Sequence, residues 1–296
     1  MFFTSKISRK QEIFYLFLRK FKKMIRLLFL LAAATLAGQN YRFVYEYKFR
    51  PDVASRDSLV TDYMNLDTDG KESYFYNAAK FEKDSVYAAT KDSKVLSEFK
   101  NFDRNLTYTI HKTYSPKSIK FYDKFQTANL VINEEKFPVW KVQNEFKKIG
   151  DINCQKATAD YRGRSWTAWF SKEYPVSDGP YKFSGLPGLV VQINDTENDH
   201  QFNLIQIKKT KNTYSFLPKS NKDISEKEFR KLWAEYRFTP DEINSMNINS
   251  KEGNMTVQLK DGYTSKISLD KVKKTKNLDA ALSLILSKSK NRIERD

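Results

Sequence analysis

Alternating apolar and polar residues recur along most of the chain and predict a protein built mainly of β-strands. The first such stretch, residues 41–49, reads YRFVYEYKF and has an aromatic side chain at every second position. This period places alternate side chains on opposite faces of a strand, so that one face is buried. A second stretch follows at 58–67, and others come at short intervals between turn residues, as is typical of antiparallel meanders.

The middle of the chain continues this pattern. Residues 137–171 are expected to form three consecutive strands with turns at Gly150-Asp151 and Arg162-Gly163, and residues 189–209 a hairpin around 196–199. In the third of these strands, RSWTAWF, Trp166, Ala168 and Phe170 are expected on one face and Ser165, Thr167 and Trp169 on the other, so one face is mostly apolar and the other mixed. Before residue 137, further strands are predicted over residues 73–77, 106–114, 118–125 and 128–135.

Helical signals are fewer. Residues 225–228 form a capping box before FRKLWAEY, and Thr, Pro and Glu at 239–242 repeat the signature of a helix start. A short helix is also expected over 84–91 and an amphipathic one over 278–293, while Asp261-Gly262 is expected to join two strands. The fold class predicted is mainly β with a few helices (β-rich α+β): a curved antiparallel sheet or half-barrel, with helices mostly in the C-terminal third.

The beginning of the chain has the features of an export signal. Basic residues lead into the apolar run 27–37, and Thr35 and Ala37 occupy the small positions before a cut near Gly38. The run is too short to span a bilayer, which needs about 20 residues. Residues 1–38 are therefore predicted to be a cleaved signal peptide, which leaves no transmembrane segment in the mature chain.

Residues 1–23 are expected to lie upstream of the true start at Met24, because the sequence from Met24 alone forms a conventional signal peptide. An uncleaved membrane anchor that also uses residues 13–18 is the alternative. The basic residues between 19 and 26 interrupt such a span and argue against it.

Removing the signal changes the charge of the protein. Residues 1–38 contribute +7 of the net charge of +16, which leaves +9 for the rest. A positive chain favours anionic lipid, lipopolysaccharide or acidic polymers, and it also serves plain solubility. An exported protein rarely meets nucleic acid, so no nucleic-acid partner is expected. Residues 39–210 are predicted to form a β-rich domain, with 211–296 as a helical and hairpin region packed on it.

Residues that could carry out catalysis are scarce. Cys154 is the single cysteine, so no internal disulfide is possible, and its strand-like neighbours favour a buried inert thiol over a reactive or intermolecularly paired one. The motifs GxSxG, HExxH and CxxC are absent from the sequence. Acid pairs such as Glu134-Glu135 are expected by chance. We therefore predict no catalytic, cofactor-binding or metal-binding residues and no enzyme, with an uncharacterised hydrolase as the remaining alternative.

The most informative stretch is GLPGLV, at residues 185–190. Glycine adopts backbone angles that other residues avoid and proline fixes its own φ, so the stretch predicts a rigid turn that leads into a buried strand. If the φ of Gly188 is positive, replacing this residue with Ala should destabilise the fold. The role predicted for the motif is structural, and its residues are Gly185, Leu186, Pro187, Gly188, Leu189 and Val190.

With its surroundings, this motif resembles the GLPGLI family, exported proteins of Bacteroidetes named for the hexapeptide, with Val190 in place of the last Ile. The resemblance covers roughly 39–209 and rests on further short matches: Tyr41-Arg42-Phe43, Tyr45-Glu46-Tyr47, Leu66-Asp67, Ser73, Phe75, Gly150, Cys154, Lys156-Ala157, Gly163-Arg164, Ala168-Trp169 and Gly179-Pro180. It implies a signal peptide, a periplasmic or envelope location and a mainly β fold. It carries over no catalytic residues. Residues 150–169 are also loosely similar to the curved sheet of periplasmic lipoprotein carriers, which implies an apolar cupped surface.

These observations predict an exported cell-envelope protein of unknown molecular function that binds an apolar or amphipathic ligand such as a lipid. A protein–protein interaction module of an outer-membrane assembly is the alternative. The candidate ligand-lining residues are Arg164, Trp166, Trp169, Phe170 and Tyr181. The competing interpretation is that these aromatic side chains fill the core, and that Arg164 stacks on an indole ring.

Overall fold

The computed structural model describes residues 40–50, 59–92, 106, 108–125, 128–211, 214, 216–217, 221–235, 243–259, 264–273 and 293–295. All of them belong to one unit, Asn40–Asp296. The predicted signal peptide, the turn at Asp261-Gly262 and nearly all of the helix expected over 278–293 lie outside these residues. Within the described part, the helices are too short or too polar to cross a membrane.

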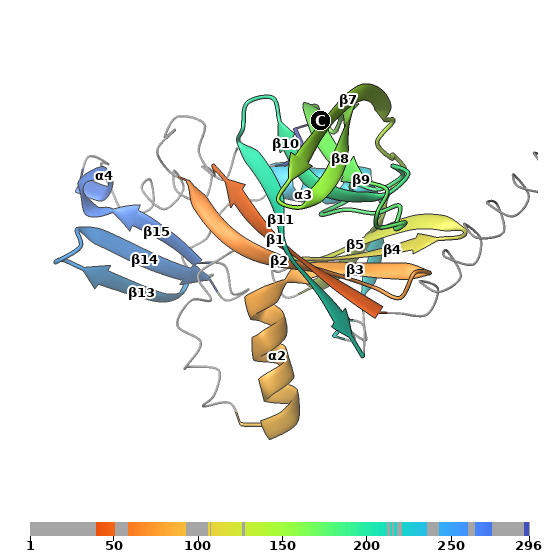
Figure 1. Cartoon of the computed structure of the whole chain (residues 1–296). Helices are drawn as coiled ribbons and strands as arrows, with labels where there is room; N and C mark the ends of the chain where they lie inside the picture. Colours follow the sequence, from red (N-terminus) through yellow and green to blue (C-terminus); the bar gives the residue numbers. More distant parts are fainter. Residues whose placement is uncertain are drawn as a thin grey trace, which may run out of the picture. The chain divides into compact units, whose positions relative to one another are not determined.

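Twelve strands form one large curved sheet in the order β12-β6-β5-β4-β3-β2-β1-β11-β10-β9-β8-β7 (Figure 1). Neighbouring strands are antiparallel except β12, which runs parallel to β6. This sheet confirms the predicted fold class. Its strands are β1 (Asn40–Phe49), β2 (Val60–Thr68), β3 (Glu72–Asn77), β4 (Thr109–Tyr114), β5 (Lys117–Phe125), β6 (Ala128–Asn133), β7 (Lys141–Ile149), β8 (Ile152–Tyr161), β9 (Arg164–Ser171), β10 (Leu189–Asp195), β11 (His200–Thr210) and β12 (Lys222–Ile224).

A second sheet has three strands, β13 (Ile243–Asn249), β14 (Asn254–Leu259) and β15 (Thr264–Ser268). The predicted hairpin of β14 and β15 is confirmed. The helix predicted to begin at Thr239 is wrong beyond residue 242, because β13 occupies those residues. Asn, Ser and Ile are modest helix formers, and pairing with β14 stabilises the extended form instead.

The other helices follow their capping residues. Helix α3 (Glu226–Glu235) begins at the predicted capping box, in which the Glu228 amide donates to Ser225 Oγ at 3.2 Å. Helix α2 (Ala78–Thr90) begins earlier than predicted, because the side chain of Asn77, and not Asp84, caps it. The short α4 (Leu269–Lys273) follows β15 directly.

The core lies on one face of the large sheet and is rich in aromatic residues. In β9 the alternation predicted from sequence is confirmed, since Trp166, Ala168 and Phe170 are buried while Ser165 is exposed. Phe183, from the segment between β9 and β10, contacts the Trp166 ring at a centroid distance of 4.6 Å. The connecting segment is therefore part of the core as well as a link between strands.

Residues beyond Thr210 also contact the large sheet. Strand β12 pairs with β6, and Phe229 and Leu232 of α3 pack against the core. Near the end of the described chain, the Arg295 amide donates to the Arg162 carbonyl at 2.9 Å.

Candidate functional site

Buried polar contacts hold the segment that leads into the GLPGLV motif. Lys112 of β4 donates to the carbonyls of Gly179 and Tyr181 at 2.7 and 3.0 Å and pairs with Asp178 at 2.5 Å. Burial lowers the pKa of the Lys112 amine, while the carboxylate of Asp178 opposes that shift. Ser73 and Tyr114 donate to the other oxygen of Asp178. All three N–H groups of Lys112 are used, so the cluster fixes the loop.

The motif itself is a tight corner at the start of β10. Gly185 and Gly188 have φ of +98° and +153°, so the condition under which Gly188 would be required for the fold is met. Leu186 and Leu189 are fully buried, and the Val190 carbonyl accepts from Tyr45 Oη at 2.6 Å. The contacts described for the corner are apolar packing and hydrogen bonds to its backbone, so they support a structural role.

A larger cluster of charged side chains includes Lys182, three residues before Gly185; we call it the Glu134 cluster. It consists of Glu134, Arg162, Lys182, Glu226, Arg230 and Glu294. Arg162 donates to Glu134 at 2.6 Å and to Glu226 at 2.7 Å. Lys182 contacts Glu134 and also Glu294, the latter at 2.6 Å. The three carboxylates and three cations balance within one small volume.

Two carboxyl groups of this cluster have pKa values shifted in opposite directions. Burial raises the pKa of Glu134 despite its contacts with Lys182 and Arg162. Burial also opposes ionisation of Glu294, but hydrogen bonds from Lys182 and Tyr181 outweigh it and lower the pKa of Glu294. Such a divergence is typical of acid–base pairs in enzymes. Here, however, the Glu134 side chain is 1 % exposed and both of its oxygens contact cations. The cluster therefore favours a structural or binding role.

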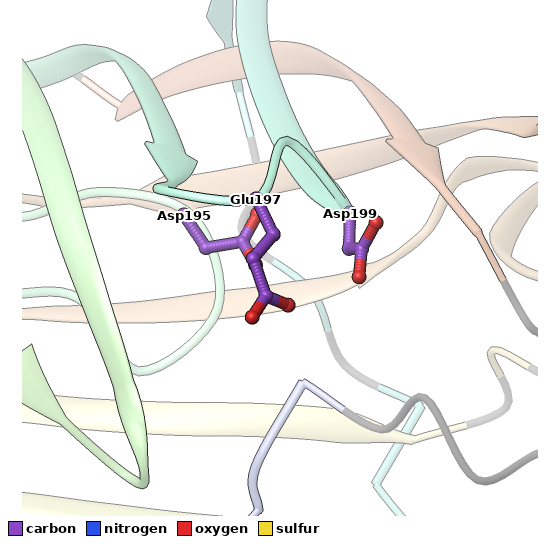
Figure 2. A group of neighbouring side chains, drawn as sticks. All are labelled: Asp195, Glu197 and Asp199. Atoms are coloured by element: carbon purple, nitrogen blue, oxygen red, sulfur yellow. The ribbon is translucent and has the colours of Figure 1, made fainter. Parts of the chain in front are cut away.

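A second group of acidic side chains lies where β10 turns into β11 (Figure 2). Asp195, Glu197 and Asp199 place one carboxylate oxygen each within 4.8 Å of one another. Oxygen ligands of this kind suit a hard cation such as Ca²⁺. Arginine side chains already contact the group, with Arg164 bonded to Asp195 at 2.6 Å and Arg295 to Glu197 at 3.0 Å. Their guanidinium groups supply the positive charge, so the arrangement favours an ion-pair network.

The structure separates the predicted ligand-lining residues. Trp166, Phe170 and Tyr181 are core residues, and Trp166 Nε1 donates to the Tyr161 carbonyl at 3.0 Å. Trp169 lies half-buried on the opposite face of β9, with Lys147 Nζ 4.2 Å from its ring centroid. Arg164 is buried in its ion pair with Asp195. The five residues therefore do not line one common surface.

Sequence reasoning missed the charged partners. Lys182 and Glu294 are 112 positions apart, and Arg162 and Glu226 are 64 apart. Neither pair follows a local spacing rule, so no pattern along the chain joins them. No sequence signal identified them, because the members of the Glu134 cluster lie in turns, connecting segments and α3, where charged residues are common.

Apolar side chains are exposed at one edge of the large sheet; we call Val139, Val142 and Phe146 the β7 patch. Their exposed fractions are 78, 49 and 67 %. Val142 lies opposite Ala157, which is fully buried on the core face. Directly opposed residues share a face of the sheet, so Val142 extends the core face into solvent. Among the described strands, β7 pairs with β8 alone.

The fold and these clusters define a β-rich protein with an open curved sheet and closed networks of charged residues. A Bacteroidetes-associated family, "Protein of unknown function (Porph_ging)", matches residues 162–192, which run from the Arg162 turn into β10. The matched residues include the motif on which the resemblance described above rests. No curated protein matches the chain.

Two solved structures are similar to the chain, those of PNGF-II in the space groups P21 and C2. Each has a TM-score of 0.48 and 11 % sequence identity, and the match covers 75 % of this chain and 40 % of that one. The chain therefore spans two fifths of the length of PNGF-II.

Proposed function

We propose that this chain is an exported, non-enzymatic binding protein of the cell envelope and that it binds a partner protein at the β7 patch. The observation that carries the proposal is the exposure of Val142 and Phe146 on an edge strand. Exposed apolar groups of this kind mark interaction sites more often than isolated surface residues do. The export features of residues 1–38 support the location.

A polypeptide suits this edge better than a small apolar ligand. Small ligands bind in concave sites that enclose most of their surface, whereas three of the candidate lining residues, Trp166, Phe170 and Tyr181, are buried in the core. An edge strand offers unpaired backbone N–H and C=O groups to a partner. The irregular pairing between Val142 and Phe146 interrupts a continuous ladder, so the two side chains would serve as the main anchors.

The lysines beside the patch define the chemistry of the partner. Lys141, Lys147 and Lys148 are exposed on β7, against one exposed acid, Glu145. Lys147 is engaged by Trp169 and Gln192 on the face opposite the patch, and Glu145 is paired with Lys156, so Lys141 and Lys148 are the cations that this edge offers a partner. A partner segment that combines apolar with acidic residues would match this surface. The closed Glu134 cluster supports a non-enzymatic role, since its carboxylates are bonded to cations within the protein.

Photo-crosslinking in intact cells tests this function. A photoreactive amino acid at Phe146 is expected to give a discrete protein adduct in the envelope fraction, and the same group at Ile248, exposed in the other sheet, is the matched control. Replacing Val142 with Ser should abolish the adduct while changing stability by less than about 0.5 kcal/mol. Adducts with lipid alone, equal adducts at both positions, or retention of the protein in the cytoplasm would contradict the proposal.

A further inference from the structure

A short segment, residues 293–295, is bound to the part of the chain that the family match covers. Ile293 packs partly buried against the core. The backbone of the segment is held by a hydrogen bond from the Arg295 amide to the Arg162 carbonyl at 2.9 Å. Its other described polar contacts are made by the side chains of Glu294 and Arg295. Contacts of this kind resemble those between a peptide ligand and its receptor.

The carboxylate of Glu294 is bound by buried donors. Lys182 Nζ lies 2.6 Å and Tyr181 Oη 2.8 Å from the same oxygen, Oε1. The Lys182 side chain is 4 % exposed, whereas the Glu294 side chain is 20 % exposed, so the carboxylate enters from the solvent side. Lys182 is also held by Glu134, which keeps the amine in place independently of Glu294.

The side chain of Arg295, which follows Glu294, is bound by acidic residues. The Arg295 guanidinium donates to Glu197 at 3.0 Å and lies 3.7 Å from Asp199. Arg164 pairs with Asp195 at 2.6 Å and also lies 3.6 Å from Glu197 and 4.0 Å from Asp199, so it contacts the same acids as Arg295. The acidic subsite is thus supported by its own contacts, as the basic subsite is.

Removing residues 293–295 would leave an unbalanced positive charge in the Glu134 cluster and an unbalanced negative charge at the acids between β10 and β11. Without Glu294, the Glu134 cluster has one more cation than anion. Without Arg295, the three acids between β10 and β11 are contacted by two described cations, Arg50 and Arg164, so one negative charge remains unbalanced. A vacated site would therefore present a positive subsite beside a negative one, which selects an acidic residue followed by a basic residue in one direction.

We propose that Tyr181, Lys182, Glu197 and Asp199 form a polypeptide-recognition site for an apolar–acidic–basic sequence, and that residues 293–295 occupy it as an internal ligand that the same sequence of another polypeptide can replace. The site is separate from the β7 patch and does not depend on a partner there. It assigns a binding role to Tyr181 and Lys182, which lie within the family-matched residues 162–192.

The test uses a variant in which the internal ligand is weakened. In purified Glu294→Ala/Arg295→Ala protein, the synthetic peptide NRIERD, the sequence from residue 291 to 296, should bind in calorimetry and raise the melting temperature. The peptide NRIRED, with the acidic and basic residues exchanged, has the same composition. It should bind about ten-fold more weakly or worse, since both ion pairs are reversed.

Wild-type protein should bind NRIERD far more weakly than the variant does, because its own segment competes at an effective concentration in the mM range. If the double variant does not fold, Glu294→Gln serves in its place, since it keeps the shape of the side chain and removes only the charge. Equal binding of NRIERD and NRIRED, or no binding of NRIERD to a folded variant, would overturn the inference. Neither outcome affects the crosslinking expected at Phe146.

Discussion

Gly188 lies so close to β9 that a Cβ atom at this position would be 2.1 Å from the carbonyl oxygen of Ser171. Its φ of +153° is also one that L side chains rarely adopt. Both restrictions arise because the motif must turn sharply and then pair Leu189 with Ser171 as β10 begins. The second glycine of the motif is therefore required by backbone proximity as well as by conformation.

Replacing Gly188 with Ala should lower the free energy of unfolding by about 3 kcal/mol or more, since it combines a clash with backbone strain. Urea denaturation of the purified protein measures this. Gly150→Ala is the matched control: its φ is +57°, but a Cβ there would have nothing within 4 Å. It should cost only about 1–2 kcal/mol. Equal midpoints for the two variants would show that the Ser171 contact is unimportant.

Local patterns predicted most strands but not the order of the sheet. The alternation in residues 41–49 identified β1, and turn residues identified the neighbouring strands β7, β8 and β9. The position of β1 between β2 and β11 was not predictable, because it depends on pairs such as Phe49 with His200 that are far apart along the chain. Alternation indicates which face is buried and carries no information about the partner strand.

The candidate site was predicted less well, for a related reason. Aromatic residues near the motif were predicted to line a ligand site, with a filled core as the alternative, because the sequence leaves both roles open. The structure places Trp166 and Phe170 in the core. The charged clusters form between residues such as Lys182 and Glu294, which tertiary folding alone brings together. A charged residue in a turn or connecting segment has no distinctive sequence signal until its partner is known.

The buried pair of Lys112 and Asp178 should be strongly coupled. Lys112→Met would leave the Asp178 carboxylate buried without its counterion, at a cost of about 3–5 kcal/mol. Asp178→Asn would likewise leave the Lys112 amine buried without its counterion. The double variant should be more stable than the sum of the single effects predicts, because neither charge then remains alone. A double-mutant cycle in urea measures the coupling, and additive effects would show that the pair does not act as a unit.

The Glu134 cluster should make the protein sensitive to acid. Burial opposes ionisation of Glu226, but hydrogen bonds from Arg162 and Arg230 outweigh it and lower the pKa below the ordinary 4.5. Ionised Glu226 therefore stabilises the fold above pH 4.5, and this stabilisation is lost as the pH falls through the folded-state pKa. Glu226→Gln should reduce the fall in melting temperature between pH 5 and 3. Glu82→Gln, on the exposed surface of α2, is the control and should leave that slope unchanged.

The thiol of Cys154 should be inert in the folded protein. Its side chain is buried in β8, and burial raises its pKa to about 11, against the opposing effect of Lys147. Thiolate is the reactive form, so alkylation by iodoacetamide at pH 8 should be about 100-fold slower in native protein than in concentrated urea. Native and unfolded protein are compared by intact mass over time. Equal rates would identify Cys154 as an accessible, reactive thiol and would favour the alternative of intermolecular pairing.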